Sequence, residues 1–169
     1  MRLDLRDIID SPGAVREFDC ELDLRELELF GEKPFESPLR VSGRVRNAAG
    51  ALELTGSATG EAHVRCDRCL KPITVAVDVP VDTLLAEETE NEDSDGILLL
   101  EDRGIDLDQV FTEEVILAWD GKHLCREDCK GLCPTCGKDL NEGPCGCGKE
   151  LDPRFAVLAK LLDKGPKEP

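Results

Sequence analysis

The chain has 169 residues, a length that fits one domain with an appendage or two small domains. Hydrophobic residues make up 40% of it, which favours a packed core over disorder, and no apolar run approaches the ~20 residues that a membrane-spanning helix needs. The net charge of −16 divides into −17 for residues 1–120 and +1 for residues 121–169. An acidic surface repels phosphate, so the first part is poorly suited to gripping nucleic acid and better suited to a basic protein partner, although the acidity alone would also keep the chain in solution.

Alternating apolar and polar residues predict β-strands through the first 100 residues of the chain. This alternation, or a short apolar run, marks residues 1–9, 18–24, 39–46, 52–64, 73–81 and 97–100. Turn-forming residues follow two of these segments, at Asp10–Gly13 and Asn47–Gly50. We expect an antiparallel meander in which the glycines within residues 52–64 mark bulges.

A helix is predicted at residues 106–119, where Val110, Phe111 and Val115 line one face, Asp106 is the candidate N-cap and Gly121 ends the helix. The acidic run at residues 87–95 is expected to form a mobile loop. Residues 152–162 predict a second, short helix with Phe155 on its apolar stripe. The predicted fold class is α+β: an acidic β-rich body at 1–120, a zinc-binding module at 121–150, and a terminal helix and tail at 151–169.

Four cysteines in the C-terminal part have the spacing of a metal site: Cys133, Cys136, Cys145 and Cys147. A C-x-x-C-Gly knuckle places two thiolates around one ion, and the Cys145-Gly-Cys147 pair supplies two more ligands nearby. Sulfur-only sites favour zinc, with iron–sulfur as the second choice. Four protein ligands leave no open position, so we expect a structural site that supplies the folding energy which residues 122–150 lack.

A second four-cysteine site is the simplest use of the remaining clustered cysteines: Cys66, Cys69, Cys125 and Cys129. Cys66 and Cys69 lie on a turn between two predicted strands, and Cys125 and Cys129 have the i, i+4 spacing of one helical turn. Two alternatives remain, a redox pair at Cys66 and Cys69 or a two-ion cluster made by the six C-terminal cysteines. The sequence therefore predicts one zinc ion and favours two.

The other potentially reactive side chains have simpler interpretations. Cys20 lies on the apolar face of its strand and is expected to pack in the core. His63 is expected to be an exposed strand residue, and His123 an exposed residue that could replace a ligand near Cys125. No catalytic arrangement stands out from the abundant acids, so we expect no enzymatic activity. Residues 1–10 lack the basic start and apolar middle of a signal peptide, so we expect a cytoplasmic protein.

The cysteine motifs, taken in order, resemble those of the YceD family, the large ribosomal RNA subunit accumulation proteins of bacteria and plastids. The resemblance rests on Cys66-Asp-Arg-Cys69-Leu-Lys-Pro, on Cys125-Arg-Glu-Asp-Cys129 followed by Cys133-Pro-Thr-Cys136-Gly-Lys-Asp-Leu-Asn141, and on Asp152-Pro-Arg-Phe155-Ala-Val-Leu158. It implies a role in accumulation of 23S ribosomal RNA, hence in biogenesis of the large subunit, and brings no catalytic residues with it. Some relatives lack the later cysteine cluster, which is therefore a subgroup feature.

Two functions from different classes remain open on the sequence. The first is a non-enzymatic assembly factor whose acidic body binds a basic ribosomal protein, while the near-neutral module contacts RNA or the pre-ribosome. Its candidate contacts are Lys122, Arg126, Lys130, Lys138 and Lys149. The second is a thiol-based redox or zinc-release switch, because the chain is dense in cysteine.

Overall fold

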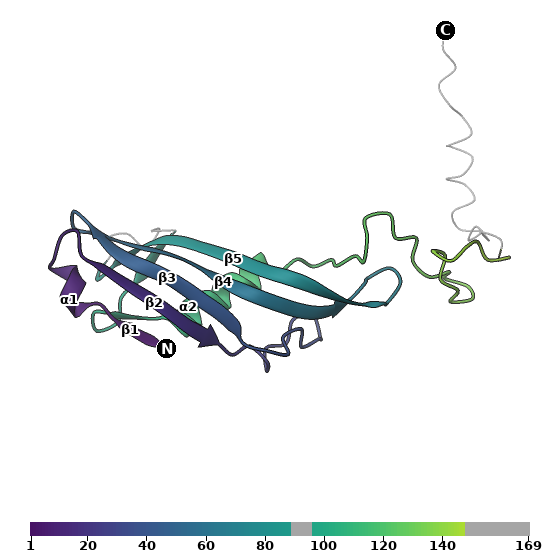
Figure 1. The fold of residues 1–169 in the computed structure, drawn as a ribbon, viewed down its shortest axis with the longest axis horizontal. Coiled ribbons are helices and arrows are strands. Elements are labelled where there is room, and N and C mark those ends of the chain that lie inside the picture. Colours follow the sequence, from purple (N-terminus) through teal and green to yellow (C-terminus); the bar gives the residue numbers. More distant parts are fainter. Residues whose placement is uncertain (89–95, 148–169) are drawn as a thin grey trace, which may run out of the picture.

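The computed structural model describes residues 1–88 and 96–147, which form a long twisted sheet with a cysteine-rich segment beyond one end (Figure 1). Most of the predicted acidic loop and the predicted helix at residues 152–162 lie outside the described residues. The α+β class is confirmed. Neither helix of the described part is long and apolar enough to cross a membrane.

The main sheet has five strands in the order β2-β3-β4-β5-β6. The first four form the predicted antiparallel meander: β2 (Val15–Leu22), β3 (Leu39–Ala48), β4 (Ala51–Arg65) and β5 (Pro72–Ala86). The fifth, β6 (Ile97–Leu99), pairs in parallel with the end of β5, an orientation that alternation alone does not specify. The β4–β5 hairpin is the longest in the sheet, and its tip faces the cysteine-rich segment.

The N-terminal segment differs from the strand predicted over residues 1–9. Only β1 (Arg2–Asp4) is extended, and it pairs with β7 (Gly104–Asp106) in a separate two-stranded sheet. The chain then forms the one-turn helix α1 (Arg6–Ile9). Two causes are visible: Leu5 and Ile8 are both buried at helical spacing, and the Asp4 carboxylate accepts the Arg6 backbone N–H at 3.0 Å.

The predicted helix is confirmed as α2 (Leu107–Ala118), which packs on the inner face of the main sheet (Figure 1). The Asp106 carboxylate accepts the Asp108 backbone N–H at 3.0 Å, the expected N-cap. Phe111 is fully buried and meets Phe18 of β2 edge to face, with the ring centroids 6.1 Å apart. Cys20, also on β2, is half-buried and packs at the margin of this core.

The predicted bulges in β4 are absent: the β4–β5 register continues without interruption past Gly56 and Gly60, and the β3–β4 register continues past Gly56. These glycines serve packing instead. Gly43 and Gly56 lie opposite each other on β3 and β4, and a Cβ on Gly43 would lie 2.7 Å from the Phe18 ring. The two positions therefore leave room for the aromatic pair that joins α2 to the sheet.

This packing predicts the result of a one-carbon change. Gly43→Ala should lower the free energy of unfolding by about 1–3 kcal/mol, since the new methyl group clashes with both the Phe18 ring and the backbone of β4. Ser42→Ala, at the half-buried neighbouring position, adds no atom; it is the control and should change the free energy of unfolding by less than about 0.5 kcal/mol. Urea unfolding followed by circular dichroism measures both, and equal effects would contradict this role of Gly43.

Candidate metal centres

The first group of cysteines begins at the tip of the β4–β5 hairpin. Cys66 follows the last residue of β4, and the chain makes a tight turn through Cys69 before β5 begins at Pro72. The Leu70 N–H donates to the Cys66 carbonyl at 2.8 Å, and the Cys66 N–H donates to the Lys71 carbonyl at 2.9 Å. Both cysteines are buried, so this turn directs its thiols inward rather than into water.

The chain that follows α2 returns to this turn and is held there by hydrogen bonds. Asp67 and His123 are joined twice: the Asp67 N–H donates to the His123 carbonyl at 2.9 Å, and the Asp67 carboxylate accepts the His123 N–H. The Arg68 guanidinium donates to the Cys129 carbonyl at 2.7 Å. Gly131, at φ +74°, allows close approach, because a Cβ there would lie 2.8 Å from the Arg68 carbonyl oxygen.

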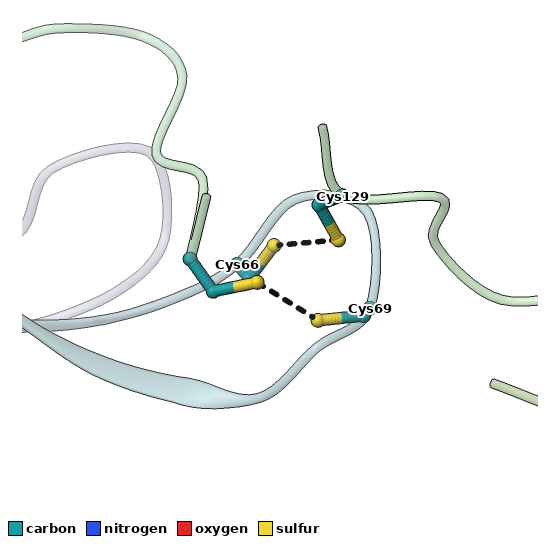
Figure 2. Close-up of side chains that lie close together, drawn as sticks. Cys66, Cys69 and Cys129 are labelled. Carbon is teal, nitrogen blue, oxygen red and sulfur yellow. Dashed lines mark hydrogen bonds between the residues drawn. The ribbon is translucent and has the colours of Figure 1, made fainter. Parts of the chain in front are cut away.

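These contacts bring together the four cysteines that the sequence analysis grouped as a second site. The sulfur of Cys66 lies 3.8 Å from that of Cys129, and Cys69 lies 3.6 Å from Cys125, with all four sulfurs within 4.8 Å of one another. Figure 2 shows the sulfurs of Cys66, Cys69 and Cys129 turned toward a common centre. Zn–S bonds of about 2.3 Å in a tetrahedron require sulfurs about 3.8 Å apart, whereas a disulfide requires about 2.05 Å. The spacing fits a metal site.

The second group contains Cys133, Cys136, Cys145 and Cys147, whose sulfurs also lie within 4.8 Å of one another. Its turn repeats the hydrogen bonds of the first: the Gly137 N–H donates to the Cys133 carbonyl at 2.8 Å, and the Cys133 N–H donates to the Lys138 carbonyl at 2.8 Å. Gly137 has φ +73° and Leu70 has φ +59°. The two turns therefore share one backbone geometry. At the left-handed position the first turn has leucine and the second has glycine.

The pKa values of the cysteines in both groups indicate that a bound cation would stabilise the four thiolates together. The backbone N–H of Cys125 lowers the pKa of Cys66 to about 6, and the N–H groups of Cys136 and Thr135 lower the pKa of Cys133 to about 6. Burial raises the pKa of Cys125 to about 12, and hydrogen bonding to Cys136 raises that of Cys147 to about 12. Without a metal ion, these pKa values favour a thiolate at Cys66 and Cys133 and a protonated thiol at Cys125 and Cys147. A metal ion would allow all four to bind as thiolates, so each group could hold one ion.

Three contacts, made by Asn141 and Lys71, link the two groups. Asn141, from the loop between Cys136 and Cys145, donates from Nδ2 toward the sulfur of Cys129 at 3.5 Å. Its Oδ1 accepts the Lys130 backbone N–H at 2.8 Å. Lys71, beside the first turn, forms an ion pair of 2.9 Å with Asp139, beside the second. Each group thus supplies part of the surroundings of the other.

Several residues lie differently from the sequence-based expectation. Cys125 and Cys129 belong to an irregular turn, closed by the Cys129 N–H donating to the Arg126 carbonyl at 3.1 Å, and not to a helical turn. His123 is half-buried against Trp119, with the ring centroids 5.0 Å apart, and is a member of neither cysteine group. His63 is exposed on β4, as predicted, beside Thr74.

The candidate basic contacts are exposed where the structure describes them: Lys122, Arg126, Lys130 and Lys138. The Arg126 guanidinium already donates to Asn141 Oδ1 at 2.7 Å, and Lys138 Nζ donates to the Pro144 carbonyl at 3.1 Å. Lys149 lies outside the described residues. The motifs quoted from the sequence contain Asp67, Arg68 and Asn141 but gave them no role, since their roles depend on contacts between residues far apart in the chain.

Comparison with known proteins gives a consistent family signal. The family described as "Large ribosomal RNA subunit accumulation protein YceD" matches residues 54–162, a range that includes both cysteine groups. An uncharacterized protein of Mycobacterium tuberculosis (strain ATCC 25618 / H37Rv) is 35% identical over 125 residues, which are 70% of this chain and 59% of the relative. An uncharacterized protein of Mycobacterium leprae is 30% identical over 132 residues, 75% of this chain and 60% of the relative.

A plant protein is also similar. The "Large ribosomal RNA subunit accumulation protein YCED homolog 1, chloroplastic" of Zea mays is 28% identical over 178 residues, covering 86% of this chain and 60% of the relative. The chain therefore spans about 60% of the length of these curated relatives. No solved structure matches it.

Leu70 and Gly137 occupy the same left-handed position in the two cysteine turns, so exchanging them should change the free energy of unfolding in opposite directions. Leu70→Gly should leave the free energy of unfolding unchanged or raise it by up to about 1 kcal/mol, because it relieves a left-handed leucine. Gly137→Leu should lower it by about 1–2 kcal/mol, since it introduces the same strain. Chemical denaturation of the metal-loaded protein measures both. A loss of more than about 1 kcal/mol for Leu70→Gly would mean that the leucine side chain stabilises the turn by packing.

Proposed function

This chain belongs to the YceD family, and on that premise we propose that it is a non-enzymatic factor supporting 23S rRNA accumulation and biogenesis of the large ribosomal subunit. The observation that carries the proposal is the family match, whose range includes the whole cysteine-rich segment. The printed name of the maize relative, which refers to large-subunit ribosomal RNA accumulation, supports the same conclusion. The proposal covers only the part of those relatives that this chain matches.

Two structural zinc ions are part of this proposal. One is held by Cys133, Cys136, Cys145 and Cys147, and the other by Cys66, Cys69, Cys125 and Cys129. Zinc suits four thiolates in tetrahedral spacing, and four protein sulfurs fill its coordination sphere. The described residues 121–147 contain no helix or strand, so the ions would supply the folding energy that a small apolar core cannot. Their role would be to fix a surface rather than to activate water.

The uneven charge distribution supports different binding roles for the acidic and the near-neutral parts of the chain. Residues 1–120 would form an acidic body that binds a basic ribosomal protein, and residues 121–150 a zinc-binding module that contacts pre-ribosomal RNA or the same partner. Residues 151–169 would form the terminal helix and tail. Among the candidate RNA contacts that the structure describes, Lys122 and Lys130 are the two whose exposed side chains donate no hydrogen bond. We further propose that the protein acts in the cytoplasm, where the large subunit of bacteria is assembled.

The metal proposal predicts two zinc ions per chain. Cys66→Ser combined with Cys129→Ser should remove one ion, and Cys136→Ser combined with Cys145→Ser the other, because a four-ligand site tolerates poorly the loss of two sulfurs. Cys20→Ser is the matched control and should retain both ions, since Cys20 lies at the core margin far from either group. Elemental analysis of purified protein measures the ratio. Iron in place of zinc, or one ion in the unaltered chain, would contradict the proposal.

The biological proposal predicts a selective defect in large-subunit RNA. Depletion of the protein in its own cells should lower the ratio of 23S to 16S rRNA, and expression of the intact chain should restore it. A pull-down from separated ribosomal fractions, read for bound protein and for crosslinked RNA, then distinguishes a protein partner from an RNA partner. An unchanged rRNA ratio in depleted cells, together with no recovery of the protein in large-subunit fractions, would refute the proposal.

A further inference from the structure

Two bulky apolar side chains are exposed at backbone positions that such residues rarely adopt. Phe30 has φ +50° and is 83% exposed at the tip of the turn Leu29–Glu32, and Leu70 has φ +59° and is 55% exposed in the first cysteine turn. A left-handed conformation is strained for a residue with a Cβ, and strain of this kind concentrates at functional sites. At the position equivalent to Leu70, the second cysteine turn has Gly137, so the geometry does not require leucine.

Phe30 and Leu70 line the same cavity although they are 40 residues apart in sequence. Its volume is about 220 Å³, and its wall is completed by Pro34, Val64, Trp119 and His123 among others. The Trp119 ring packs edge to face between Phe35 and His123, with centroids 5.4 Å and 5.0 Å away. The buried Nε2 of His123 has no hydrogen-bond partner among the residues that the structure describes. The cavity wall thus combines apolar side chains with polar ones, among them the unpartnered Nε2 of His123.

The lining of this cavity contains more acidic than basic side chains. Glu32, Asp67 and Asp120 line the cavity together with a single cation, Arg65. Three carboxylates against one guanidinium repel an RNA phosphate chain and attract lysine and arginine. The charge of the lining has the same sign as that of residues 1–120 as a whole. The preferred occupant is therefore apolar at its centre and basic at its flanks.

We propose that the surface formed by Phe30, Leu70 and this cavity, the Phe30–Leu70 surface, binds an apolar side chain in a lysine- and arginine-rich segment of a large-subunit ribosomal protein. The proposal rests on the function proposed above and adds the site and the chemistry of the segment. The apolar side chain would enter between Phe30 and Leu70, and the flanking cations would lie against Glu32 and Asp120. The first cysteine group fixes the Leu70 half of the surface, since Leu70 follows Cys69 directly.

Substitution tests the apolar part of this surface. Phe30→Asn combined with Leu70→Asn removes both apolar side chains, and asparagine is among the residues that best tolerate positive φ. Leu117→Asn is the matched control, because Leu117 on α2 is 79% exposed but does not line the cavity. The probe is the total protein extracted from purified large ribosomal subunits, captured on the immobilised full-length chain and identified by mass spectrometry.

We expect the unaltered chain and the Leu117→Asn control to capture a basic large-subunit protein, and the double variant to bind it at least ~10-fold more weakly. Glu32→Gln combined with Asp120→Asn leaves the apolar part intact and should weaken capture at low salt more than at high salt. Equal binding by the double variant and the control would overturn the site. It would leave the proposed function standing, because that function is tested separately by the rRNA ratio in depleted cells.

A crosslink identifies the occupant without weakening the surface. A photoreactive benzoylphenylalanine in place of Phe30 keeps an aromatic ring at the tip of the turn, and irradiation of the full-length protein in cells joins it to whatever lies there. A crosslink to a lysine- and arginine-rich segment of a large-subunit protein supports the proposal. Crosslinks only to RNA, only to residues 148–169 of the same chain, or to nothing would each overturn it.

Discussion

The junction between the β4–β5 hairpin and the returning chain after α2 is the contact on which the rest of the cysteine-rich segment depends. Cys66 and Cys69 come from the hairpin, Cys125 and Cys129 from the returning chain, and their sulfurs converge at metal-binding distances. Asp67 and Arg68 add hydrogen bonds across the same junction. The long sheet thereby ends at the point where the cysteine-rich segment attaches, and hydrogen bonds hold a segment with little apolar content against the hairpin.

The two cysteine turns carry the same hydrogen bonds but make different use of them. The second turn has Gly137 at the left-handed position and presents only backbone there, whereas the first has Leu70 and presents an apolar side chain. Because Asn141 and the Lys71–Asp139 ion pair connect the two groups, we expect the loss of one group to weaken contacts made by the other. A damaged second group would therefore loosen the hairpin junction although its own ligands lie elsewhere.

Local patterns were enough to predict much of this architecture. Alternation identified β2 to β5, and the spacing of Val110, Phe111 and Val115 together with the Asp106 cap identified α2. The prediction was wrong at residues 1–9, where helical burial of Leu5 and Ile8 overrides a short alternating pattern, and at the glycines of β4, which make room for Phe18 and Phe111. The parallel pairing of β6 and the contact of Asn141 with Cys129 depend on tertiary contacts, which no local pattern records.

The separation of the first cysteine group along the chain has a consequence for synthesis. Cys69 and Cys125 are 56 residues apart, so a ribosome elongating at about 5–20 residues per second completes Cys125 roughly 3–11 seconds after Cys69. During that interval the hairpin tip carries two cysteine thiols whose partner ligands do not yet exist. A nascent chain in this state is open to oxidation or to capture of the wrong metal, and the second group, made from residues at most 14 apart, passes through its own exposed stage far more quickly.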